Sequence, residues 1–232
     1  MLNFLRKLRR NNMKNSQYFQ YAFGEIILVV VGILIALGIN NWNEERKTLA
    51  NESRLLQKVK AENDYNLQIL LDDTAYFRGI DERIFNLALR LKEPQSPKRD
   101  SLIGMGLNDA LRVTTLEFSD EYLSRYINSS ENDDGDFIFD FIELKDTYGS
   151  VETSSEFPAD FKFKNILSAL ETSIDFVEGE ILDMKQLEDW VFVNRLIILS
   201  SIEESRSYNI FNCIDNARKV DSLLNIRLGL SD

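Results

Sequence analysis

Few side chains in this sequence are of the types that carry out covalent or metal chemistry. There is no histidine, and the single cysteine is Cys213. Histidine is the commonest general base and transition-metal ligand, and a zinc–thiolate cluster, a redox pair or an internal disulfide needs more than one cysteine. The sequence also contains no glycine-rich phosphate loop and no nucleophile elbow. We therefore expect no metal and no cofactor, and we interpret Cys213 as a small buried residue on a helix rather than a reactive thiol.

Acidic residues supply the remaining candidates for chemistry. The run Asn132-Asp133-Asp134-Gly135-Asp136 superficially resembles part of a calcium-binding loop. An EF-hand loop needs glycine at its sixth position and glutamate at its twelfth, and neither register of this run meets both needs. We interpret the run as a solvated loop.

Two pairs of adjacent acids, Asp72-Asp73 and Glu203-Glu204, are the candidates for acid–base work. Adjacent residues of a helix point in different directions, so the members of one pair do not face a common substrate. We expect these acids to lie on exposed helix faces. An active site would need acids brought together by folding, and we predict that the protein is not an enzyme.

One long apolar stretch dominates the chain. Residues 22–39 carry a single charge, Glu25, and at about 1.5 Å per residue they nearly cross a hydrocarbon core of ~30 Å. Residues 1–20 contain five basic residues and no acid, which favours a cytoplasmic N-terminus. A cleaved secretory signal, with a cleavage site at Ala36-Leu37-Gly38, and a buried core helix are the other interpretations, and we favour a single transmembrane helix. Aromatic residues that could anchor it at the two headgroup regions are Tyr18, Phe19, Tyr21, Phe23 and Trp42.

Two features inside this stretch are candidates for function. Glu25 is an acid within an apolar helix, which is costly in lipid and for that reason often functional. We favour the simpler interpretation that it lies at headgroup depth and pairs with the basic leader. Gly32 and Ala36 form a small-xxx-small pair, which lets two helices approach closely, so this face is our candidate for helix–helix contact and homo-oligomerisation.

The flanks and the charge divide the chain into three parts. We predict a basic cytoplasmic leader (1–20), a transmembrane helix (21–41) and an extracytoplasmic domain (42–232). The total charge is −11, and because residues 1–20 carry +5 and residues 21–47 carry −1, residues 48–232 carry −15. Such an acidic domain excludes the basic face that nucleic-acid binding needs and disfavours contact with anionic lipid.

Many leucines and glutamates and only three prolines favour helices in the domain. The predicted fold is all-α, in which the transmembrane helix runs into a long helix that precedes an antiparallel bundle of about five or six helices. We expect the long helix to reach about residue 92 and to be antiparallel to the last helix. Other expected features are helices capped by Ser101 and Ser119, a helix over 137–148, a turn over 149–155, a helix with Pro158 in its first turn that extends to Val177, a buried helix over 190–199 (a strand is the alternative) and a closing helix that ends near Gly229.

The stretch Gly24 to Leu37, followed by Ile39-Asn40-Asn41-Trp42-Asn43-Glu44, resembles the N-terminal signature of an uncharacterised bacterial family. That family is known only as a membrane-anchored domain of unknown function. The resemblance covers residues 18–46 and implies a single-pass membrane protein with no stated activity. It also implies that Glu25 and the Asn-Asn-Trp-Asn exit are features of the family.

These observations predict a non-enzymatic helical module, anchored in the inner membrane, that acts as a protein-interaction or structural subunit at its outer face. The partners we expect are the lipid bilayer, a second copy through the Gly32 and Ala36 face, and an unidentified membrane or periplasmic protein. The alternative is a membrane-anchored sensor that binds a small ligand between its helices. A buried, partly polar cavity around Asn63, Asn66 and Asn194 would favour this alternative.

Overall fold

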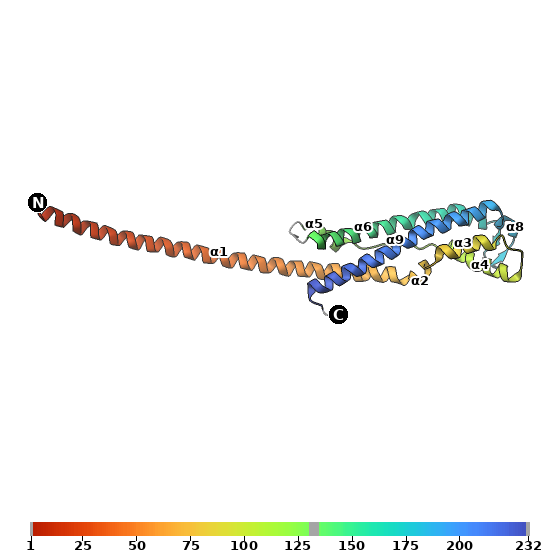
Figure 1. Cartoon of the computed structure of the whole chain (residues 1–232), viewed down its shortest axis with the longest axis horizontal. Helices are drawn as coiled ribbons and strands as arrows, with labels where there is room; N and C mark the ends of the chain where they lie inside the picture. The colour runs from red at the N-terminus through yellow and green to blue at the C-terminus, as the bar shows by residue number, and fades with distance from the viewer. Residues whose placement is uncertain (1, 130–134, 231–232) are drawn as a thin grey trace. The chain divides into compact units, whose positions relative to one another are not determined.

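The computed structural model describes residues 2–129 and 135–230, with side chains described from residue 23 onward except at residues 135 and 136. In chain order the elements are α1 (Leu2–Asp72), α2 (Thr74–Phe77), α3 (Ile80–Arg90), α4 (Pro97–Leu111), α5 (Glu121–Asn128), α6 (Gly135–Phe161), the π-helix η1 (Lys162–Leu167), α7 (Ser168–Leu170), β1 (Ile174–Asp175), β2 (Glu180–Ile181), α8 (Met184–Leu187) and α9 (Trp190–Leu228) (Figure 1). Apart from the two short strands the described elements are helices. The predicted all-α fold is confirmed, with a long apolar N-terminal helix that precedes a helical bundle.

The chain divides into two compact units, Met1–Arg54 and Leu55–Asp232. In the first unit the described residues all belong to α1, and none of its side chains from Phe23 to Arg54 is buried. Among the described residues one helix is long and apolar enough, by length and composition, to cross a membrane. Its most apolar window contains no buried residue.

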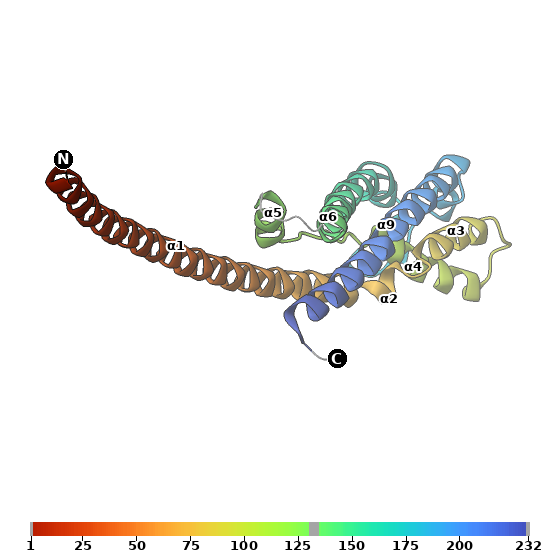
Figure 2. The ribbon, with the colours of Figure 1, turned by 60° about the vertical axis from the view of Figure 1, so that its left-hand side comes forward.

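The second unit, which we call the body, is a bundle centred on α9. This helix packs against α6 and α3, and α3 packs against α4 (Figures 1 and 2). Contacts of Asn63 with Ala217 and of Lys60 with Asp221 show that the last turns of α1 run antiparallel to α9, as predicted. The core includes the fully buried side chains of Leu70, Phe77, Ile84, Ile103, Phe141, Leu144, Leu196 and Leu224.

Several predicted boundaries were wrong because local breakers and caps lie elsewhere. The long first helix does not reach residue 92: it ends at Asp72, and Gly79, in the left-handed region at φ +69°, precedes α3. The helix expected after Ser101 begins at Pro97 instead, because the Ser96 side chain accepts a hydrogen bond from the amide of Arg99. Ser119 is not a cap either, since Asp120 precedes α5 and the Ser119 hydroxyl donates to Glu62.

The turn predicted over residues 149–155 does not form. The helix α6 continues through Gly149 and contains Pro158 in its interior, so Pro158 is not a first-turn residue. Burial of Tyr148 and Val151 on the same side as Ser155 explains this result, because packing against the bundle outweighs the weak helix propensity of glycine and serine.

The helix predicted to extend to Val177 ends at Leu170, and a hairpin follows. Strands β1 and β2 pair antiparallel, with Ile174 opposite Ile181. At the end of the hairpin nearest the helices, the carbonyl of Ser173 accepts hydrogen bonds from the amides of Leu182 and Asp183. Beyond it, α9 is a single helix that includes residues 190–199, so the helix predicted there is confirmed and the strand alternative is wrong. The expectation that this stretch is buried holds for one face only, because Trp190, Ile197 and Ile198 are exposed. The helix ends before Gly229, as expected.

Candidate functional site

Residues 112–120, between α4 and α5, form neither helix nor strand. We call this segment the connector. An extended segment must find partners for its backbone amides and carbonyls outside a regular ladder. Side chains from α1, α2, η1, α6 and α9 provide several of these partners, and they form the main polar constellation in the body.

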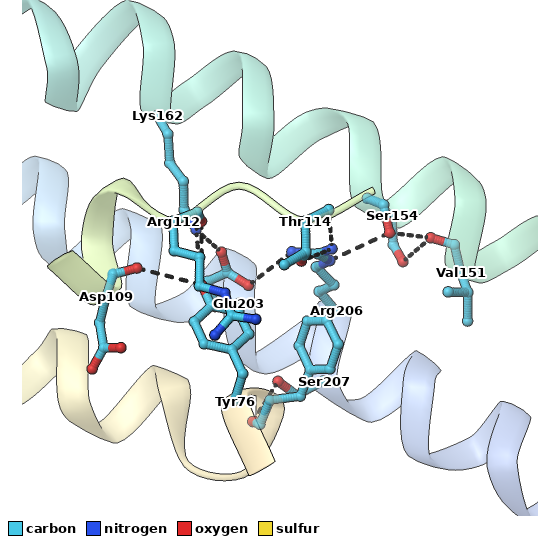
Figure 3. Close-up of polar contacts among 12 residues, drawn as sticks. Tyr76, Asp109, Arg112, Thr114, Val151, Ser154, Lys162, Glu203, Arg206 and Ser207 are labelled. Carbon is cyan, nitrogen blue, oxygen red and sulfur yellow. Dashed lines mark hydrogen bonds and ion pairs between the residues drawn. The ribbon is translucent and has the colours of Figure 1, made fainter. Parts of the chain in front are cut away.

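Three charged side chains meet at one end of the connector. Lys162 of η1, and Glu203 and Arg206 of α9, are 2%, 0% and 1% exposed. The Lys162 Nζ atom lies 2.5 Å from Glu203 Oε1, and Arg206 Nη1 lies 3.6 Å from Glu203 Oε2. We call this group the buried charge cluster (Figure 3). One carboxylate thus lies between two cations, away from water.

The same two cations hold the connector. Lys162 Nζ donates to the carbonyl of Arg112 at 2.7 Å, and the Tyr76 hydroxyl donates to that carbonyl at 3.2 Å. Arg206 Nη2 donates to the carbonyl of Thr114 and, at 2.7 Å, to its hydroxyl (Figure 3). The cluster therefore connects η1, α9 and the start of the connector through charge-assisted hydrogen bonds, which are stronger than neutral ones.

Burial shapes the electrostatics of the cluster. It lowers the pKa of Lys162 and of Arg206, and in both cases Glu203 opposes the effect by favouring the charged form. Burial, followed by the charge of Glu203, raises the pKa of the Tyr76 hydroxyl. The guanidinium of Arg206 also lies 4.9 Å from the ring centroid of Phe77, so a π face covers part of this charge.

A second group of polar side chains holds the other end of the connector. Glu62 of α1 accepts from the Ser119 hydroxyl at 2.8 Å and from the amides of Tyr122 and Leu123 at 3.1 and 2.9 Å. The Asn66 amide accepts from the Ser119 amide at 3.1 Å and donates to its carbonyl at 2.7 Å. Since the first amides of α5 have no partner within their own helix, Glu62 caps α5 from a different helix.

This arrangement fixes a chain segment, and it leaves no room for a ligand at the asparagines that the alternative of a small-ligand sensor depends on. Asn63 and Asn66 are buried, but Asn194 is exposed, so the three do not line a common cavity. The space lined by Glu62, Asn63, Asn66, Leu123, Leu144 and Tyr148 does not admit a water-sized sphere. Asn63 is instead satisfied by donating to Ala217 and accepting from Tyr148, at 3.0 and 3.1 Å. The polar cavity that would have favoured a small-ligand sensor is therefore not found around these asparagines.

The candidate residues in the apolar stretch belong to the first unit. Glu25, Gly32 and Ala36 are exposed on α1, and a Cβ atom added at Gly32 would meet nothing within 4 Å. Their predicted roles in lipid and in helix–helix contact remain predictions. Residues 132–134 of the acidic run, the side chains of its residues 135 and 136, and the side chains of the basic leader lie outside what the structure describes.

The expectation that both acid pairs are exposed was wrong in one important position. Asp72 and Glu204 are exposed, and Asp73 is half-buried beside Arg112 at 2.6 Å, but Glu203 is fully buried. The signal for this was present in α9, where residues 196, 199, 203, 206, 210 and 213 recur at helical spacing on one face. Glu203 and Arg206 are the two charged members of that otherwise apolar row.

Cys213 belongs to the same row and is fully buried, as predicted. Burial raises the pKa of its thiol from 9.0 to about 12, so it stays protonated and poorly nucleophilic near neutral pH. The nearby Thr147 hydrogen bond opposes this shift only in part. The structure therefore supports a packing role for this residue.

Together these features define a class of helical protein. Polar side chains hold an irregular connector within its bundle, and among the described residues one apolar helix is long enough to cross a membrane. Over residues 25–80 the chain matches the model of a family described as a family of unknown function (DUF6090). This match confirms the resemblance to a domain of unknown function, and it includes Glu25, the exit at Asn40 to Asn43, and the part of α1 that carries Glu62 and Asn66. No curated protein and no solved structure matches the chain.

Proposed function

We propose that the protein is a single-pass membrane protein with a cytoplasmic N-terminus, whose helical body binds another protein on the extracytoplasmic side without catalysing a reaction. The observation that carries the membrane part is the exposure of α1. From Phe23 to Ile39 every large apolar side chain is exposed, and none of the most apolar window is buried. A helix that is apolar on all sides needs an apolar surrounding, and lipid supplies one.

The direction of insertion rests on charge. The leader carries five basic residues and no acid, whereas the residues after the span include the balanced group Glu44-Glu45-Arg46-Lys47. Basic residues collect on the cytoplasmic side of a span, which favours a cytoplasmic leader and an extracytoplasmic body.

Protein binding is favoured over ligand binding by the way the polar groups of the body are used. The buried charge cluster and Glu62 are occupied by the chain's own backbone, and the asparagine region has no space for a ligand. What remains available is the surface, which is acidic and also carries exposed aromatic and aliphatic side chains. A body with such a surface is suited to binding a partner protein.

The experiment combines extraction with a disruptive substitution. Membranes that contain the full chain are washed with alkaline carbonate, which releases peripheral proteins but leaves integral ones. We expect the wild-type protein to stay in the pellet. The variant Val30→Arg with Leu34→Arg should be released, because an arginine at the centre of a span costs about 2.5–3.5 kcal/mol. Release of the wild-type protein would contradict the membrane part of the proposal. The matched control, Ser201→Arg with Ser205→Arg on the exposed face of α9, should stay in the pellet.

A further inference from the structure

The hairpin that interrupts the helical body ends in a turn with a well-defined conformation. We call residues 174–183 the hairpin tip. The Asp175 carboxylate accepts from the amides of Val177 and Glu178 at 2.8 and 3.2 Å, and the carbonyl of Asp175 accepts from the amide of Gly179 at 2.8 Å. Gly179 has a φ of +73°, a conformation that a side chain would strain. The turn is therefore held in one shape by its own hydrogen bonds.

This turn presents apolar side chains to solvent. Ile174 and Ile181 pack against the core and fasten the hairpin to the body. Phe176, Val177 and Leu182 face outward, and Val177 is 91% exposed. Turns on protein surfaces usually carry polar residues, so an apolar group held outward by a fixed backbone is unusual.

Acids neighbour these apolar residues in the sequence. The hairpin tip contains Asp175, Glu178, Glu180 and Asp183 and no basic residue. Asp175 lies directly across the ladder from Glu180, and like charges at such positions destabilise a sheet. The tip thus combines exposed apolar side chains with four acids, of which Asp175 and Asp183 also accept from backbone amides.

The tip also lies at an identifiable place in the body. It directly precedes α8 and the start of α9, whereas the last turns of α9 contact α1 through Ala217 and Asp221. A helix of 39 residues is roughly 58 Å long, so the tip, which lies next to the start of α9, is far from the end of α9 that contacts α1 (Figure 1).

We propose that the hairpin tip is the docking element of the body, and that it inserts Phe176 and Val177 into an apolar pocket bordered by lysine and arginine on a partner protein. This inference rests on the proposed function and names the kind of partner. Apolar anchors that enter a pocket supply most of the affinity of an interface, and a complementary charged rim steers the encounter. A turn already fixed in its bound shape loses little entropy on binding.

The negative charge of the tip disfavours two other partners, a second copy of the chain and an anionic membrane surface. A second copy would bring an equally acidic tip or another face of a body that carries most of the chain's negative charge, and like charges would repel. An anionic membrane surface would repel the tip in the same way. A basic pocket is the complement that the four acids favour.

The test uses the full chain in native membranes, with the photoreactive residue benzoylphenylalanine in place of Val177 and, as a control, in place of the exposed Ile226 near the end of α9. Crosslinked peptides are identified by mass spectrometry. We expect position 177 to crosslink to one protein, at a segment in which apolar residues neighbour lysine or arginine. The double change Glu178→Lys with Glu180→Lys should reduce this adduct at least tenfold. The same change of charge at two exposed positions of α9, Glu204→Lys with Asp215→Lys, should leave it unaltered.

The other outcomes overturn the inference. They are an adduct from position 177 to a second copy, to lipid or to a segment without basic residues, an adduct that the hairpin charge reversal does not reduce, and no adduct at all. Protein adducts from position 226 but none from position 177 would refute the hairpin tip and leave the proposed protein-binding function standing. An absence of protein adducts at both positions, and at the exposed Met105 and Tyr208 as further sites, would refute both. Thermal unfolding of each variant, followed by circular dichroism, checks that the body remains folded.

Discussion

The Nζ atom of Lys162 lies 2.5 Å from Oε1 of Glu203, and both side chains are removed from solvent. Lys162 belongs to η1 and Glu203 to α9, so this ion pair joins two elements across the bundle. Because Lys162 also donates to the carbonyl of Arg112, the pair positions the connector as well. A buried charge that loses its partner is costly, which makes the pair a sensitive point of the fold.

Removal of the negative charge should therefore destabilise the body strongly. Glu203→Gln leaves Lys162 and Arg206 buried without a counter-charge, and we expect the free energy of unfolding to fall by about 3–5 kcal/mol. The measurement is urea unfolding of the full chain in detergent, followed by circular dichroism. The adjacent, exposed Glu204→Gln is the control and should change the free energy by less than about 0.5 kcal/mol. Equal effects of the two substitutions would show that the cluster does not stabilise the body.

Glu62 should control the order of α5. It accepts from the amides of Tyr122 and Leu123, so Glu62→Gln replaces a charged acceptor with a weaker one. We expect these two amides to lose about 1–3 kcal/mol of protection, which is roughly a 5- to 150-fold increase in hydrogen exchange. The exposed Glu117→Gln, in the same connector, should leave their exchange unchanged. Unaltered exchange in the Glu62 variant would mean that α5 does not depend on α1.

Two glycines of α4 should respond to alanine in opposite directions. A Cβ at Gly106 would lie 3.1 Å from both Cβ and Cδ1 of Leu87, whereas a Cβ at Gly104 would meet nothing within 4 Å. Gly106→Ala should lower the free energy of unfolding by about 1–3 kcal/mol through overpacking. Gly104→Ala should raise it by about 0.5–1 kcal/mol, because alanine is the better helix former. Stabilisation by both substitutions would show that α3 and α4 do not pack as closely as the structure has them.

Stability should fall at alkaline pH, in part because of Cys213. Burial raises the pKa of this thiol from 9.0 to about 12, so between these values the folded chain holds a proton that the unfolded chain has lost. Stability contributed by such a group is complete below the unfolded pKa and is lost as the pH rises. We expect the difference in unfolding free energy between the wild type and Cys213→Ala to shrink by up to about 1.4 kcal/mol per pH unit above pH 9. A difference that stays constant from pH 8 to pH 11 would show that the thiol is accessible to base in the folded chain.

Sequence patterns predicted the parts of the fold that depend on local composition. The apolar run of α1, the helical class, the helix at residues 190–199 and the burial of Cys213 all follow from hydrophobic periodicity or length. The buried charge cluster could not be predicted in this way. The apolar row of α9 marks Glu203 as a buried position, but its partner Lys162 is distant in sequence, and only folding brings the two together.

The hairpin and α6 are two regions where local sequence patterns predicted the wrong secondary structure. The apolar residues from Phe161 to Val177 have helical spacing, yet the Asp175 carboxylate and the Ser173 carbonyl stabilise a turn there. In α6 the burial of Val151 keeps a helix intact across Gly149. Hydrogen bonds and packing that form only in the folded chain decided both outcomes against the local propensities.

We propose that α1 crosses a membrane and leaves the body outside the cytoplasm. Thiol labelling in intact cells tests it most directly, with Cys213→Ala as the background and a single new cysteine at Ser16 in the leader or at the exposed Ser205 of the body. A maleimide that cannot cross the inner membrane should label Ser205→Cys in intact cells whose outer barrier has been permeabilised, and it should label Ser16→Cys only after the inner membrane is opened. Labelling of Ser16→Cys before lysis, or protection of Ser205→Cys until lysis, would contradict the claim.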